Sequence, residues 1–331
     1  MNQVLFLTQG ADDKLPSRRL RILSILPYLK SFDFLIDVAP INFLHVLFIL
    51  PNVLKSKIIF LQKELVPLSF LLLLKVLRKP MIFDFDDAIY LRHLSSGEFR
   101  QSNKRNFRFS LICKFAKLVI AGNEILSKAA ASRGAKCVQV IPTSVALPRI
   151  KSLFVGGSKK VILGWIGTEV NLIYLEDWES IFNKLNSNGL RFEIWAMSSK
   201  PPKFRKFNQF KFFKWSEVAE KKFLKNIDIG LMPLFKNEYT EGKCAFKALQ
   251  YLSYSKPVVA SDVGINRLWL NNASYVSNDK DVIMVCLEEL IRDYKKRHFF
   301  GKQGYRIIKK NFERKLIAYK VERAINSILL S

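Results

Sequence analysis

The chain contains 331 residues, of which 49% are hydrophobic and 25% are charged, a composition that is typical of globular proteins and excludes a disordered chain. This length accommodates two domains of ordinary size. The formal net charge of +26 is spread over both halves, which predicts a partner with negative charge: a nucleic acid, an anionic membrane or a phosphorylated small molecule.

Short apolar runs alternate with amphipathic stretches in the first half of the chain. Residues 17–30 are predicted to form the first helix. The predicted strands span residues 3–10, 32–37, 57–62, 80–86, 117–123 and 137–142. Because most of these runs are apolar along their whole length, we expect a parallel sheet with helices on both faces.

A second alternating series follows a segment rich in Pro, Gly, Ser and Lys. We expect this linker at residues 151–160. The predicted strands after it span residues 161–167, 190–197, 210–215, 227–234, 257–262 and 274–278, and the end of the chain is expected to be helical.

The two series predict an α/β protein with two Rossmann-like domains whose parallel sheets face an interdomain cleft. We assign residues 1–150 to a first, acceptor-binding domain and residues 161–305 to a second, donor-binding domain. Residues 306–331 are expected to form a C-terminal helix that packs back on the first domain. Ligands of such sheets bind at the carboxyl ends of the strands.

The remaining composition favours a cytoplasmic protein. The four cysteines are far apart without a CxxC pair, and the three histidines are scattered, so neither a disulfide framework nor a metal site is expected. We expect no signal peptide at the N-terminus. We interpret the two longest apolar runs as buried core, because one is interrupted by charged residues and Pro and the other is too short to span a bilayer.

Two βα turns in the second domain carry candidate ligand-binding groups. In VILGWIGTEVN, Gly167 lets a ligand approach the backbone and Thr168 offers a hydroxyl. In EYTEGKCAFKALQ, Gly242 and Lys243 lie at an expected helix start, Lys247 follows one turn later, and Glu241 precedes the turn. This arrangement favours a phosphate site with a sugar nearby; a capped helix with solvated lysines is the alternative.

The series of motifs resembles the retaining GT-B glycosyltransferases of the family-4 type. The segment from Glu238 to Gly264, EYTEGKCAFKALQYLSYSKPVVASDVG, is similar to their C-terminal signature. The stretches PSRRLRILSILPYL, AGNEILSKAAASRGAKCVQVIPTSV and LGWIGTEVNLIYLE resemble others of their motifs in the same order, over almost the whole chain.

The resemblance implies transfer of a sugar from a nucleotide-diphosphate-sugar donor to an acceptor hydroxyl, with retention of configuration and no cofactor or obligatory metal. It also implies a pair of acidic residues that hold the donor. In this sequence the position of the first is occupied by Gly242, beside Glu241, and the position of the second by Gln250. The usual basic pair after the first strand of the second domain is also missing, and we expect Lys243 and Lys247 to supply its charge.

Three acids cluster at the end of a predicted strand of the first domain, in MIFDFDDAIY. A DxD metal site is rejected, because the surrounding pattern is that of the doubly wound domain. The resemblance places Asp86 where the family has an active-site histidine, and Asp84 and Asp87 are expected to bind the acceptor; a structural cluster is the alternative. Arg19 and Arg21 are expected to bind an anionic acceptor, or to belong to an ordinary basic helix.

The leading hypothesis is a glycosyltransferase of the hexosyltransferase type, with Asp86, Glu241 and Lys243 as catalytic residues and with Gly167, Thr168, Gly242, Lys247 and Gln250 binding the donor. We expect a glycan or lipid-linked acceptor from the synthesis of a bacterial surface polysaccharide or glycolipid. We also expect a peripheral contact with an anionic membrane.

Two alternatives stay open. One is a nucleic-acid-binding protein that uses the basic clusters at residues 100–117, 200–225 and 292–315. The other is a sugar-nucleotide epimerase or a weakened homologue.

Overall fold

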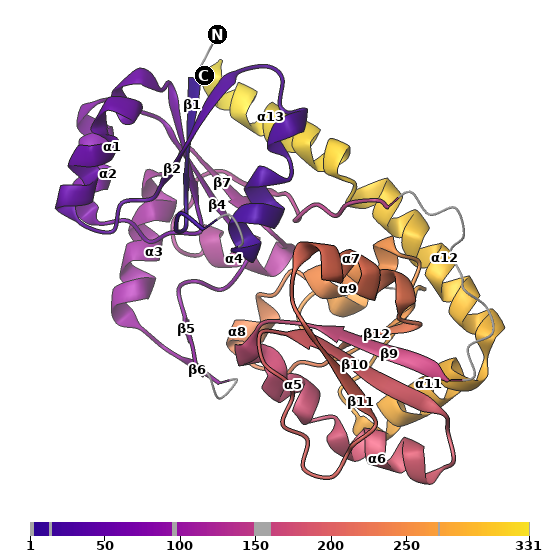
Figure 1. Cartoon of the computed structure of the whole chain (residues 1–331). Helices are drawn as coiled ribbons and strands as arrows, with labels where there is room; N and C mark the ends of the chain where they lie inside the picture. The colour runs from indigo at the N-terminus through magenta and orange to yellow at the C-terminus, as the bar shows by residue number, and fades with distance from the viewer. Residues whose placement is uncertain (1–2, 13–14, 95–97, 149–159, 271, 331) are drawn as a thin grey trace.

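The computed structural model describes residues 3–12, 15–94, 98–148, 160–270 and 272–330, and it divides into two α/β domains (Figure 1). Most of the expected linker, residues 151–159, lies outside the described residues. The prediction of two parallel, doubly wound sheets is confirmed.

The first sheet has the strand order β2-β1-β3-β4-β7-β8, with every neighbouring pair parallel. Its strands are β1 (Gln3–Thr8), β2 (Asp33–Val38), β3 (Ile58–Gln62), β4 (Met81–Phe85), β7 (Leu118–Ala121) and β8 (Val138–Val140). A short antiparallel pair, β5 (Arg92–His93) with β6 (Phe99–Arg100), lies outside it.

Alternate residues of these strands point to opposite faces, and both faces are covered. Leu5 and Leu7 pack against one set of helices: α1 (Phe43–Lys55), α2 (Leu68–Val76), α3 (Asn103–Phe115) and α4 (Glu124–Ala131). Val4 and Phe6 point to the other face, which is covered by the segment 18–29 and by α13 (Arg314–Leu329). The central strands are mostly apolar because both of their faces are buried.

The expected helix over residues 17–30 is interrupted. Arg18–Leu23 forms a single π-helical turn, and Leu26–Tyr28 forms a 3-10 turn. Pro27 contributes no backbone N–H group, so a continuous α-helix cannot run through it without losing a hydrogen bond.

The second sheet has the strand order β11-β10-β9-β12-β13-β14, again with parallel pairs throughout. Its strands are β9 (Val161–Ile166), β10 (Phe192–Ser198), β11 (Phe210–Lys214), β12 (Ile229–Met232), β13 (Val258–Ala260) and β14 (Ser274–Val276). One face packs on α7 (Glu217–Asn226), α9 (Phe246–Ser253) and α12 (Tyr294–Asn311). The other face packs on α5 (Leu172–Glu176), α6 (Glu179–Ser187) and α11 (Lys280–Arg292).

The C-terminal part of the chain returns to the first domain. Helix α12 belongs to the second domain, and the next helix, α13, lies along the first sheet (Figure 1). Ile317, Val321 and Ile325 of α13 are buried with Phe6. Near this crossing Val145 N donates to Phe312 O at 2.9 Å. The two domains are therefore also connected by packing.

Candidate functional site

A cavity of about 390 Å³ lies between the two domains, where the carboxyl ends of strands from both sheets meet. Its lining includes Arg19, Lys63, Asp86, Asp87 and Thr143 from the first domain, and Trp165, Gly167, Thr168, Trp215, Glu220, Lys243, Lys247 and Gln250 from the second. Eight of the predicted site residues thus meet here, although they lie far apart in the sequence. Four others, Arg21, Asp84, Glu241 and Gly242, do not line the cavity.

Lys247 is the most unusual charge in the cavity. Its Nζ lies 4.6 Å from the centre of the Trp165 ring, and among the described residues it forms no ion pair. Burial, together with the neighbouring charge of Lys243, lowers the pKa of Lys247 to about 7. A half-buried ammonium group without a counterion favours binding of an anion.

Gly167 allows this packing. A Cβ atom at position 167 would lie 2.4 Å from the Trp165 ring and 2.7 Å from Lys247 Nζ, so only glycine fits between them. The Gly167 N–H donates to Met197 O at 3.0 Å and therefore takes part in the sheet. Thr168 Oγ1 accepts a hydrogen bond from the Asn171 side chain at 2.6 Å. Gly167 therefore contributes by leaving space for Trp165 and Lys247 to pack together.

Lys243 adds a second cation beside Lys247. Its Nζ lies 5.3 Å from the centre of the Tyr239 ring. Burial lowers the pKa of Lys243, although the carboxylate of Asp87 acts in the opposite direction. Among the described residues Lys243 also forms no ion pair, so two lysines without a directly bonded carboxylate face the same cavity.

The helix behind these lysines begins later than the sequence predicts. Residues Glu238–Glu241 form a separate helical turn, α8, whose start is closed by a capping box between Asn237 and Thr240. Helix α9 then begins at Phe246, after Ala245 in a left-handed conformation with φ of 51°. The N-terminus of α9 lines the cavity and adds the positive end of the helix dipole to the two ammonium groups.

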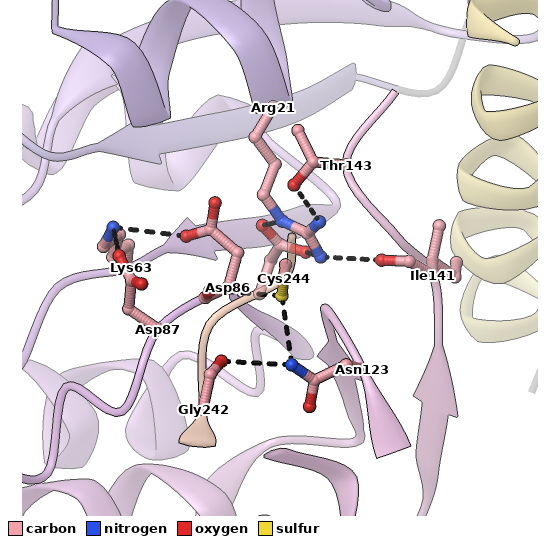
Figure 2. A network of polar contacts seen from close by, with 10 residues as sticks. Arg21, Lys63, Asp86, Asp87, Asn123, Ile141, Thr143, Gly242 and Cys244 are labelled. Carbon is pink, nitrogen blue, oxygen red and sulfur yellow. Dashed lines mark hydrogen bonds and ion pairs between the residues drawn. The ribbon is translucent and has the colours of Figure 1, made fainter. Parts of the chain in front are cut away.

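Gly242 does not line the cavity. It joins the two domains through a hydrogen bond with Asn123 (Figure 2). Its carbonyl accepts a hydrogen bond from Asn123 Nδ2 at 3.0 Å, and a Cβ atom here would lie 3.0 Å from that of Ala88. The next residues continue this contact, since Cys244 Sγ donates to the backbone carbonyl of Asp86 at 3.2 Å. Burial raises the pKa of Cys244 well above its usual value, so this thiol stays protonated.

Glu241 also has a different position from the expected one. Its Oε2 accepts a hydrogen bond from the Gly264 N–H at 2.7 Å. Gly264 has φ of 59°, and a Cβ atom there would lie 2.5 Å from Glu241 O. Glu241 therefore holds the turn after β13, and the expectation that it orients the sugar is not supported by the geometry.

Arg21 and Asp84 form a buried ion pair (Figure 2). Two guanidinium nitrogens of Arg21 lie 2.7 Å from the two carboxylate oxygens of Asp84, and Arg21 also donates to Thr143 Oγ1 and Ile141 O. Burial would lower the pKa of Arg21, but the Asp84 carboxylate reverses the effect and raises it. All of these partners are protein groups, which argues against the expected role of both residues in acceptor binding.

Lys63 holds the other two acids of the cluster and was missed by the sequence analysis. Its Nζ lies 3.3 Å from Asp86 Oδ1 and forms a close ion pair with Asp87 (Figure 2). Burial opposes the charge of Lys63, but Asp86 and Asp87 raise its pKa above the usual value. The sequence did carry a signal for Lys63, because this residue directly follows β3, which lies next to β4 in the sheet.

Among the described residues, no three His, Cys, Asp or Glu side chains are arranged to hold a metal ion.

Glu220 is the second residue that the sequence analysis missed. Its Oε1 accepts a hydrogen bond from Gln250 Nε2 at 2.7 Å, and its Oε2 accepts one from Trp215 Nε1 at 2.6 Å. Arg19 approaches from the first domain, 3.6 Å from Glu220 and 3.1 Å from Glu217. No sequence pattern marked Glu220, because α7 lies about thirty residues before α9 and only the fold brings them together.

No protein-family model and no curated relative matches this chain. Solved structures do match. Anabaena HepE, solved in complex with UDP and glucose, has a TM-score of 0.72 and 13% identity, with 99% of this chain and 100% of that chain covered. Sucrose-phosphate synthase from Thermosynechococcus elongatus has a TM-score of 0.70 and 9% identity over the full length of both chains. A glycosyltransferase from Rickettsia africae has a TM-score of 0.68 and 14% identity over 99% of both chains. At these identities the likeness establishes the fold, and the prediction of a GT-B fold is confirmed.

Proposed function

We propose that this protein is a glycosyltransferase that moves a sugar from a nucleoside-diphosphate donor to an acceptor hydroxyl. The observation that carries the proposal is the position of Lys243 and Lys247, two cations at the N-terminus of α9 in the interdomain cavity that form no ion pair with any of the described residues. Structures with the same fold have been solved with UDP or a UDP-sugar. UDP is therefore the first nucleotide to test.

In the proposed reaction, the bond between the sugar's anomeric carbon and the diphosphate breaks, and its electron pair passes to the leaving diphosphate. The acceptor oxygen forms the new bond to that carbon and loses its proton. Lys243, Lys247 and the N-terminus of α9 stabilise the charge that develops on the diphosphate. Because Lys247 is already positioned over Trp165, little reorganisation is needed during the reaction.

The opposite wall of the cavity suits the acceptor. Asp86 and Asp87 line it and are oriented by Lys63. Carboxylates at this position can accept hydrogen bonds from hydroxyl groups or take up a proton. We assign the acceptor side of the site to these residues and to Arg19, and the donor side to Gly167, Thr168, Lys243, Lys247 and Gln250, with Glu220 added.

We further propose the finer properties that the family resemblance implies. These are retention of configuration, a glycan or lipid-linked acceptor in the synthesis of a bacterial surface polysaccharide or glycolipid, and action in the cytoplasm. An NMR measurement of the anomeric coupling in the product, compared with that of the donor, tests retention.

The nucleic-acid hypothesis fits the structure less well. The aromatic residues in the basic cluster at residues 200–225 would have to be available for stacking on bases. Instead, the rings of Phe204, Phe207 and Phe210 pack against one another, and Phe182 and Phe192 join them. Phe213 packs on Trp195 and Phe223 in the same way.

A thermal-shift panel tests the proposal. UDP, GDP, ADP, CMP and a single-stranded RNA are compared at equal concentration, and one nucleoside diphosphate is expected to raise the unfolding temperature. Stabilisation by RNA alone, falling steeply with salt, would contradict the proposal. Turnover is then sought with the sugar conjugates of the nucleotide that binds.

A further inference from the structure

The outward face of α1 is apolar. Its inward side chains Val46, Ile49 and Val53 are buried against the first sheet, as in any helix that covers a sheet. The outward face, which is normally polar, carries Phe43, Leu44, Leu47, Phe48 and Leu54, all of them exposed. Phe48 is 81% exposed. A helix that is apolar on all sides is usually buried on all sides, so this face lacks a partner in the described structure.

Helix α2 continues the same surface. Leu68, Leu72 and Val76 are exposed and are spaced four residues apart, so they form one stripe along the helix. The helix packs beside α1 on the same side of the sheet (Figure 1). We call the exposed side chains of Phe43, Leu44, Leu47, Phe48, Leu54, Leu68, Leu72 and Val76 the α1–α2 face.

Positive charge lies at one edge of this face, where α1 and α2 end. Between Val38 and Phe83 the only acidic residue is Glu64. Lys55, Lys57, Lys75 and Arg78 are exposed at or just after the C-terminal ends of the two helices. Lys79 joins these ends, because its Nζ donates to Leu54 O and Ser56 O at 2.8 and 2.6 Å. The apolar surface thus has one basic edge, which we call the basic rim.

We infer that the α1–α2 face rests on an anionic lipid bilayer, with the apolar side chains in the interfacial layer and the basic rim on the lipid headgroups. An apolar face with lysines and arginines at its edge is the chemistry that binds such a surface. A second copy of the chain fits less well, since docking through the same face would bring two basic rims together. In the part of the chain that the structure describes, no helix combines the length and the hydropathy of a membrane-spanning segment.

The neighbouring helix extends the contact. Helix α3 packs beside α2 and carries exposed Lys104 and Phe107. It belongs to the basic segment at residues 100–117, which contains no acid. This proposal goes beyond the transfer reaction, because it assigns a lipid surface as partner to the first domain and stands whether or not the cavity binds a nucleotide.

Sedimentation with vesicles tests the inference on the full chain. Vesicles of phosphatidylcholine alone are compared with vesicles that contain equal amounts of phosphatidylcholine and phosphatidylglycerol. The protein is expected to bind the second kind and to be released progressively by salt. Phe48→Ser is expected to weaken this binding roughly tenfold, because a large apolar side chain no longer enters the interface. The charge reversal Lys55→Glu/Lys75→Glu is expected to weaken it by roughly tenfold or more.

Phe299→Ser is the matched control, since Phe299 is an exposed phenylalanine on α12, at 56% exposure, far from the α1–α2 face in the sequence. This control is expected to bind vesicles as the unchanged protein does. Equal loss in Phe299→Ser, equal binding to both kinds of vesicle, or no binding to either overturns the inference. Size-exclusion chromatography with light scattering is run in parallel: a dimer that Phe48→Ser converts to a monomer, with no vesicle binding, would show that a second copy covers the face.

Discussion

Gln250 Nε2 donates a hydrogen bond to Glu220 Oε1 at 2.7 Å, from α9 to α7 at the wall of the interdomain cavity. The resemblance to family-4 glycosyltransferases places a carboxylate at position 250, and the sequence has an amide there. The structure supplies a carboxylate from a different helix within hydrogen-bonding distance of that amide. We therefore expect Gln250 and Glu220 to act together on the donor.

Exchanging the two side chains tests this relationship. Gln250→Glu alone places two carboxylates in contact, so we expect weaker UDP binding and a loss of about 1–3 kcal/mol in the free energy of unfolding. Glu220→Gln alone removes the charge that Arg19 and Trp215 contact and is expected to weaken binding as well. The double variant Glu220→Gln/Gln250→Glu restores one carboxylate and one amide and is expected to recover much of both losses.

Calorimetric titration with UDP and urea unfolding at pH 8 are the measurements for this exchange. Gln139→Glu serves as the control, because Gln139 is exposed on β8. Additive losses in the double variant would show that the two residues act independently.

Replacement of Lys247 by methionine tests the anion site. Lys247→Met removes the charge and keeps an unbranched apolar side chain over Trp165. We expect the Kd for UDP to rise roughly 10- to 100-fold, the amount that loss of a hydrogen bond to a charged group typically causes. The protein without ligand is expected to be at least as stable as before, since a half-buried charge has been removed. Lys221→Met, at an exposed lysine of α7, is the control. An unchanged Kd in Lys247→Met would place the diphosphate elsewhere.

The lowered pKa of Lys247 predicts how donor binding depends on pH. In the empty cavity Lys247 loses its proton near pH 7, and a bound diphosphate favours the protonated form. Binding above pH 7 therefore takes up a proton, and affinity for a UDP-sugar is expected to fall by up to about tenfold per pH unit as the pH rises from 7. A UDP-sugar is used because its diphosphate has no group that titrates in this range. Lys247→Met is expected to abolish the dependence, and a slope that persists in this variant would assign it to another group.

Lys247 has the opposite effect on the stability of the empty protein. In the unfolded chain it keeps its proton up to its ordinary pKa of 10.5, and the folded protein releases the proton near pH 7. Between these values the unfolded state binds more protons, so the contribution of Lys247 to stability rises with pH. The measurement is the urea midpoint of the unchanged protein and of Lys247→Met from pH 6 to pH 9. The stability of the unchanged protein relative to the variant is expected to rise with pH over this range.

The buried pair of Arg21 and Asp84 is expected to matter for stability and not for ligand affinity. Arg21→Met or Asp84→Asn leaves one partner without its counterpart, and each is expected to lower the free energy of unfolding by about 3–5 kcal/mol. The double variant is expected to lose less than the sum, because no unpaired charge remains. Urea unfolding checks this, with UDP affinity measured below the onset of unfolding. A strong loss of UDP affinity in a variant that remains folded would instead show that the pair contributes to ligand binding.

Much of the fold could be predicted because the strands of a parallel sheet buried on both faces appear in the sequence as short apolar runs. Runs such as Ile58–Gln62 and Val161–Ile166 have few polar residues, since neither of their faces meets water. The start of α9 could not be predicted in this way. The capping box at Asn237 closes a separate turn before it, and the left-handed residue that precedes α9 is an alanine, which carries no such signal.

The site was predictable where it depends on strand ends and not where it depends on the pairing of side chains. Asp86 and Lys247 reach the cavity because each follows a strand of its sheet at the carboxyl edge. Asp84 lies within β4 and Arg21 lies in the π-helical turn after β1, and their side chains pair with each other in the interior instead of lining the cavity. Lys63 and Glu220 were missed because their partners lie on other strands and helices.

The sequence by itself determined the two sheets, the order of their elements and the concentration of basic residues, because hydrophobic periodicity and charge are local properties of the chain. Only the tertiary structure decided which charges are neutralised. It pairs Arg21 with Asp84, Lys63 with Asp86 and Asp87, and Glu220 with Gln250. It leaves Lys243 and Lys247 without an ion pair among the described residues. The physical reason is that the strength of a charge interaction depends on distance and burial, and these are fixed only when the two domains pack against each other.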